Sequence, residues 1–255
     1  MRLGFLFGWM LVCSLAVRAG EAPGLKLIHD LGRVRLIADP VSAETGFAPR
    51  GANFRVTFEF ARMHIEPKPF EKSADELSAP GIWRSPMEWL GGKGAKARLE
   101  CCCVKRPWGL QEITVAAARV FLVNSSDQPY STNLSVLIAP EGALPALAFE
   151  QQAFFIEGEP ILVAAAPSRG AILADAPFAP RPMTPQQMAH VESADGGCRG
   201  EMLYDLTVPA GQTQILGFIC PVAPPEGGKR PDLDFYRSLS VDELFDQAAK
   251  ETAGK

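Results

Sequence analysis

The sequence has few of the residues that bind nucleic acid or do acid–base chemistry. It holds only three histidines, and its 25 lysines and arginines are outnumbered by 29 acidic residues, so the net charge is −4. The basic residues gather nowhere into a run. An acidic surface without a basic cluster repels phosphate backbones and anionic headgroups. We therefore expect neither nucleic acid nor a membrane surface as a partner.

Catalytic and metal-binding motifs are missing as well. His29, His64 and His190 lie far apart and show neither the His-x-x-x-His nor the Glu-x-x-His spacing of helical metal sites. The chain has no Gly-x-Ser-x-Gly elbow, phosphate-binding loop or dinucleotide-binding glycine pattern. Glycoside hydrolysis needs two carboxyl groups, and nothing selects a pair among Glu141, Glu150, Glu157, Glu159, Asp175 and Asp205. We expect no catalytic residue, no metal and no cofactor.

No apolar run is long enough to span a bilayer, which takes about 20 residues. The chain begins with Arg2, an uncharged stretch from Leu3 to Val17, and small residues at Ala19 and Gly20. This order is typical of a secretory signal peptide, predicted over residues 1–19, with an uncleaved anchor as the alternative. Cleavage would leave 23 basic against 29 acidic residues, a net charge of −6. The predicted location is periplasmic or extracellular.

Five cysteines follow the leader, and their odd number leaves at least one thiol unpaired in an oxidising compartment. Adjacent strand residues point to opposite faces, so only Cys101 and Cys103 of the Cys101-Cys102-Cys103 triplet can share a side. No Cys-x-x-Cys pair or nearby histidine completes a metal site. We expect small buried residues, with at most one disulfide from the triplet to Cys198 or Cys220.

What the sequence does contain is alternating hydrophobicity. The segment "NFRVTFEF" places Phe54, Val56, Phe58 and Phe60 on one face, as in a half-buried strand. The segment "QEITVAAARVFLVN" is apolar at nearly every position, as in a strand covered on both faces. About a dozen such segments and few helices predict an all-β fold, a large antiparallel two-sheet sandwich over residues 20–222.

Two connections are distinctive. The segment "NSSDQP" from Asn124 to Pro129 carries side chains that bond their own backbone in turns. It predicts a strand–turn–strand unit, interpreted as an antiparallel hairpin. Pro107-Trp108-Gly109 separates two other strands, "ARLECCCVKR" and "QEITVAAARVFLVN".

The last residues, 223–255, predict a linker or arm followed by a short C-terminal helix. Ser240 and Glu243 form a capping box, and the segment Val241–Ala249 has its apolar residues on one side. An exposed apolar side would indicate a missing protein partner, whereas a buried one would indicate a self-contained domain.

Three tryptophans and an arginine are the candidate ligand contacts. Trp83, Arg84 and Trp89 lie in "GIWRSPMEWLGG", and Trp108 follows later. Tryptophan faces in loops can stack on sugar rings while an arginine bonds hydroxyl groups. Tryptophans also pack loops onto sheets, which is the alternative. We take these four residues as predicted carbohydrate-binding residues.

From "ITVAAARVFLVNSSDQPYSTNLSVLI" to "YDLTVPAGQTQILGFICP" the order of strands and turns resembles the N-terminal supersandwich domain of modular glycoside hydrolases and phosphorylases. That domain is galactose mutarotase-like in fold and precedes a catalytic (α/α)6 barrel. Since this chain stops where the barrel would begin, the resemblance implies a non-catalytic, carbohydrate-associated module. The module is then either free-standing or one half of a split enzyme, whose separate barrel protein docks through the Val241–Ala249 helix.

Two other functions stay open at this point. A mutarotase-like epimerase or a lyase would need His64 or His190 to meet an acid such as Glu59 or Glu192 in a pocket. A structural component of an envelope complex would need neither chemistry nor sugar binding.

Overall fold

The computed structural model describes residues 27–30, 34–38, 45–60, 81–85, 88–89, 94–175, 190–222 and 230–253. Most of these residues lie in strands, and two short helices close the chain. The prediction of an all-β, two-sheet antiparallel sandwich is confirmed. The predicted leader (1–19), the first part of the predicted linker (223–229) and His64 lie outside the described residues.

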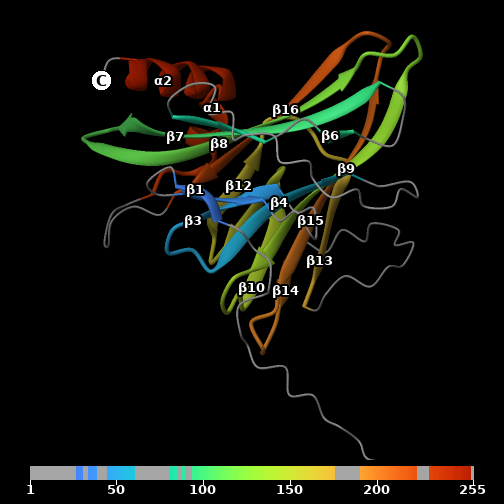
Figure 1. Ribbon diagram of the computed structural model, residues 1–255. Helices are drawn as coiled ribbons and strands as arrows, with labels where there is room; N and C mark the ends of the chain where they lie inside the picture. Colours follow the sequence, from blue (N-terminus) through green and yellow to red (C-terminus); the bar gives the residue numbers. More distant parts are fainter. Residues whose placement is uncertain are drawn as a thin grey trace, which may run out of the picture.

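The strands form two antiparallel sheets (Figure 1). In spatial order, the seven-stranded sheet contains β1 (Leu27–Asp30), β2 (Val34–Ala38), β3 (Thr45–Pro49), β4 (Phe54–Phe60), β9 (Tyr130–Pro140), β15 (Arg199–Val208) and β13 (Gly170–Ala174). The nine-stranded sheet contains β14 (His190–Glu192), β10 (Ala146–Glu150), β11 (Ala153–Ile156), β12 (Glu159–Ala164), β16 (Thr213–Pro221), β8 (Gln111–Asn124), β7 (Ala95–Trp108) and β5 (Ile82–Arg84), with β6 (Glu88–Trp89) also paired to β7.

The main core lies between the two sheets and follows the alternation of the strands. Phe54, Val56 and Phe58 of β4 are buried there, as predicted. The ring of Phe58 lies 5.3 Å from that of Phe218, which comes from β16 of the opposite sheet. Period-two patterning therefore places one face of each sheet against the other.

The Asn124–Pro129 turn does not close a hairpin, so this prediction is wrong. β8 pairs with β7 and β16, whereas β9 pairs with β4 and β15, and the turn therefore crosses from one sheet to the other. The buried side chain of Asn124 holds the crossing: its amide donates to the carbonyl oxygens of Gln128 at 2.8 Å and of Val208 at 3.0 Å. Its Oδ1 accepts from Ser126 Oγ at 2.6 Å.

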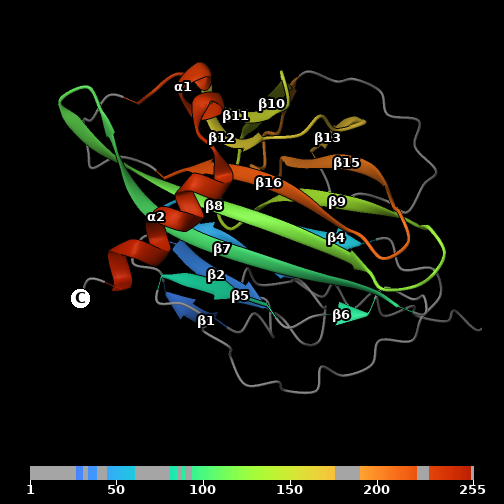
Figure 2. The same cartoon turned by 90° about the horizontal axis from the view of Figure 1, so that it is seen from above.

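Two helices, α1 (Leu233–Ser238) and α2 (Val241–Ala253), cover part of the outer face of the nine-stranded sheet (Figures 1 and 2). The first was not predicted; it begins at Asp232, whose Oδ1 accepts from the Phe235 N–H at 3.0 Å. The second begins where predicted, and the Glu243 N–H donates to Ser240 Oγ at 3.4 Å.

The apolar side of α2 is buried on the sheet. Leu244, Phe245 and Ala248 contact a second apolar cluster built from outer-face residues such as Val104 and Val115. The domain thus covers the apolar side of its own helix, and this side offers no exposed docking surface.

The cysteines alternate as predicted but form no disulfide within the described residues. Cys101 belongs to the core between the sheets and Cys102 to the cluster under the helices. Cys103 of β7 and Cys220 of β16 are both register partners of Ala116 in β8, the strand between them. Their Cα atoms therefore lie two strand spacings apart, about 10 Å. A disulfide needs Cα atoms within about 7 Å, and a bridge between Cys103 and Cys220 is therefore excluded.

Candidate functional site

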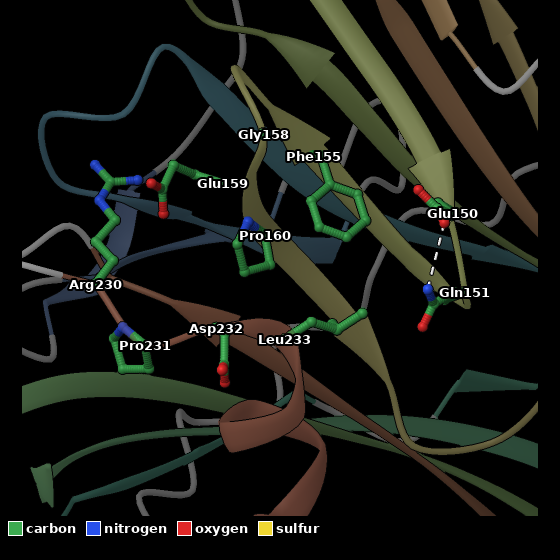
Figure 3. A pocket seen from close by; sticks show the side chains of 10 residues that line it. All are labelled: Glu150, Gln151, Phe155, Gly158, Glu159, Pro160, Arg230, Pro231, Asp232 and Leu233. Carbon is green, nitrogen blue, oxygen red and sulfur yellow. Dashed lines mark hydrogen bonds between the residues drawn. The ribbon is translucent and has the colours of Figure 1, made fainter.

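A shallow cavity lies where the turns around β11 meet the start of α1 (Figure 3). It holds about 440 Å³ and includes Glu150 and Glu159, two of the carboxylates noted in the sequence. Figure 3 shows Glu159 turned toward Arg230, while Glu150 accepts from Gln151 at 3.3 Å. The two carboxylates point in different directions, and so they do not converge on one atom as paired acids in a glycosidase must.

A more distinctive group of side chains lies on the outer face of the nine-stranded sheet, beyond α2. We call it the arginine face: Arg84 of β5, Arg98 and Glu100 of β7, and Arg119 and Phe121 of β8. Glu100 is the register partner of both Arg84 and Arg119, and Arg98 is the partner of Phe121. Register partners share a side of the sheet, so these residues form two adjacent rows. Figure 2 shows β7, β8 and β16 running on past α2 with no helix over them.

Glu100 is the centre of the arginine face. It is 1% exposed. Its Oε1 lies 2.5 Å from Arg84 Nε and 2.9 Å from Arg98 Nη2, and its Oε2 lies 2.8 Å from Arg119 Nη2. The arginine side chains are 32%, 29% and 17% exposed, respectively. One buried carboxylate therefore serves three guanidinium groups, which reach solvent with excess positive charge.

Aromatic rings hold two of the guanidinium groups in place. The guanidinium carbon of Arg119 lies 3.8 Å from the ring centre of Phe245 in α2 and 5.3 Å from that of Phe121. The guanidinium carbon of Arg98 lies 4.9 Å from the same Phe121 ring. Ile215 of β16, the register partner of Phe121, is 48% exposed beside them. Rigid guanidinium groups next to an apolar surface can bind a planar polar group through paired hydrogen bonds.

The helix completes the site from the other side. Asp242 in the first turn of α2 lies 3.1 Å from Arg119 Nη1. Arg119 is therefore bound at once to a carboxylate of the sheet, a carboxylate of the helix and the ring of Phe245. This arrangement fixes the position of its guanidinium group and with it one side of the arginine face.

Of the four sequence-predicted contacts, Arg84 belongs to the arginine face. Trp83, in strand β5 rather than a loop, is 3% exposed and lies in the core between the sheets, so its ring is not accessible to a ligand. Trp108 lies at the far end of β7, against the apolar cluster under the helices. Trp89 is the register partner of Lys96, but its side chain lies outside the described structure.

Sequence reasoning missed Arg98, Glu100, Arg119 and Phe121. Two observations could have found them: Arg119 interrupts an otherwise apolar strand, and a turn was expected near Trp108. In an antiparallel hairpin the numbers of paired residues have a constant sum. A turn that pairs Trp108 with Gln111 therefore also pairs Glu100 with Arg119.

The histidine–acid pair required by an enzyme is found only at the surface of the described residues. His190 Nε2 lies 3.1 Å from Glu192 Oε1, with both side chains exposed on β14 and neither lining a described cavity. The described ranges contain no group of three residues suited to hold a metal ion. None of the helices described is long and apolar enough to cross a membrane.

No protein-family model matches this chain, and no curated protein matches it in sequence. The resemblance to supersandwich domains stays a prediction from the sequence.

Proposed function

We propose that this chain is a non-catalytic, carbohydrate-associated β-sandwich module and that its ligand contacts the arginine face. The observation that carries the proposal is the pre-organised set of partly exposed guanidinium groups around Phe121, beside the helix α2. Guanidinium groups donate paired hydrogen bonds to neighbouring sugar oxygens. The ring of Phe121 and the side chain of Ile215 supply apolar surface for the C–H face of a sugar.

The chemistry of the face favours binding over catalysis. Glu100 is its central carboxylate, and this group is buried and bound to three arginines. A general acid or base must come within hydrogen-bond reach of the substrate, which such a carboxylate does not. The exposed His190–Glu192 pair lines neither of the cavities found among the described residues, so the described structure favours the binding module over an epimerase or lyase.

The predicted leader places the module in the periplasm or outside the cell. A glycoside-hydrolase barrel protein remains a proposed partner. Because the apolar side of α2 packs on the sheet, such a partner would contact the exposed polar side of the helix.

The test is a glycan-binding measurement on the mature chain, residues 20–255, with the Arg98→Ala variant beside it. Arg98 is half-exposed in the site, whereas Lys105, on the same strand, belongs to an exposed pair with Glu112 and makes a matched control in Lys105→Ala. We expect binding that Arg98→Ala abolishes and Lys105→Ala preserves. Silence of the wild type on glycan arrays, or equal binding by both variants, would refute the proposal.

A further inference from the structure

We infer that the ligand of the arginine face is an acidic carbohydrate, recognised through its carboxylate or sulfate groups. This inference rests on the proposed function and adds the chemical class of the sugar. It follows from the charge of the site, from its hydrogen-bond donors and from the way its strands are paired.

The charge of the face is positive in a protein that is negative overall. Three guanidinium groups meet Glu100 in the sheet and Asp242 from α2, which leaves an excess of one positive charge. Asp242 is 77% exposed, so solvent screens its charge. A local excess of positive charge within a chain of net charge −4 selects an anionic ligand.

The donors of the arginines exceed the acceptors around them. A guanidinium group carries five N–H donors, and Glu100 offers two oxygens to three such groups. The Nε atoms of the three arginines and Oε1 of Glu100 are buried and have no hydrogen-bond partner in the described part of the chain, so these atoms do not contact a ligand. A carboxylate or a sulfate at the exposed edge of Arg84 and Arg98 would accept hydrogen bonds from N–H groups that Glu100 does not use and would balance the charge.

The strand pairing favours a carbohydrate over an acidic peptide. β8 lies between β7 and β16, so its backbone groups are already used within the sheet. A peptide bound by strand addition needs a free sheet edge, and in this face only the short strands β5 and β6 lie at an edge. Around β7 and β8 recognition uses side chains, and guanidinium groups flanked by Phe121 and Ile215 suit a sugar ring with one apolar face and an attached anion.

The experiment compares matched acidic and neutral polymers by isothermal titration calorimetry on the mature chain. Oligogalacturonate is titrated against its carboxyl-reduced form, and dextran sulfate against dextran, each at 50 and 500 mM NaCl. We expect about tenfold tighter binding of at least one acidic polymer than of its neutral counterpart. We also expect this preference to shrink at high salt, because the contacts are partly exposed.

Two variants test whether the arginine face is responsible. Arg98→Gln should remove most of the acidic preference. Arg84→Gln, on the edge strand β5, should reduce this preference and serves as the second test if Arg98→Gln does not fold. Lys105→Gln should leave the preference unchanged. Folding of each variant is checked by urea unfolding.

The outcomes separate this inference from the proposed function. Equal binding of acidic and neutral polymers, lowered equally by Arg98→Gln, would overturn the inference and leave the carbohydrate module standing. Absence of binding to any polymer would overturn both. Competition by poly-glutamate as strong as by oligogalacturonate would overturn the assignment to carbohydrate and indicate an acidic polypeptide instead.

Discussion

Replacing Glu100 by glutamine removes the one buried carboxylate that three arginines share. The change keeps the size of the side chain but leaves Arg84, Arg98 and Arg119 facing one another without their common anion. Loss of one partner of a buried ion pair costs about 3 to 5 kcal/mol. The arginines are partly exposed and can turn toward water, which places the expected loss near the lower end, about 3 kcal/mol.

The assay is urea unfolding followed by tryptophan fluorescence and circular dichroism, with Glu112→Gln as control. Glu112 forms an exposed pair with Lys105 at 3.2 Å, and loss of such a pair costs less than about 1 kcal/mol. We expect a large loss of unfolding free energy for Glu100→Gln and almost none for Glu112→Gln. Equal stability of Glu100→Gln and the wild type would refute the argument that this carboxylate holds the arginines together.

Three further predictions concern the scaffold. Phe245→Ala should lower the free energy of unfolding by about 3 kcal/mol or more. Asp246→Ala, at an exposed position of the same helix, should change this free energy by less than about 0.5 kcal/mol. Equal effects of the two changes in urea unfolding would show that α2 does not pack on the sheet. Asn124→Ala should lower the free energy of unfolding by roughly 2 kcal/mol, because the carbonyl oxygens of Gln128 and Val208 lose the amide that donates to them. An unchanged urea midpoint would contradict this. Burial raises the pKa of the Cys102 thiol from 9.0 to about 12. The protonated thiol therefore contributes fully to the stability of the folded state below pH 9, and this contribution is lost as the pH rises toward 12. The alkaline fall in stability should therefore be shallower for Cys102→Ala, and parallel curves would contradict the burial.

Local patterns predicted the parts of the fold that depend on local physics. The alternation around Phe54 and Val56 identified β4, and Ser240 with Glu243 marked the start of α2. The crossing at Asn124 could not be predicted, because turn residues fix a reversal of the chain but not the sheet that the next strand joins. The helix after Asp232 is only six residues long, too short for a hydrophobic period to stand out.

The candidate site was predicted only in part for a related reason. Trp83 and Arg84 are neighbours on a strand of three residues, in which no alternation is long enough to show which side chain faces solvent. Pairing with β7 decides this, since Trp83 lies opposite Cys101 of the core and Arg84 opposite Glu100. The chemistry of the site thus depends on register across three strands, which composition and spacing do not contain.

The central claim is that an acidic sugar contacts the arginine face. The most direct measurement is nitrogen-detected NMR of the arginine Nε groups while oligogalacturonate is added to the mature chain. We expect shifts at Arg84, Arg98 and Arg119 that saturate together, with the exposed Arg169, directly before β13 of the other sheet, unchanged. Shifts confined to Arg230 in the cavity beside α1, or spread evenly over all arginines, would contradict it.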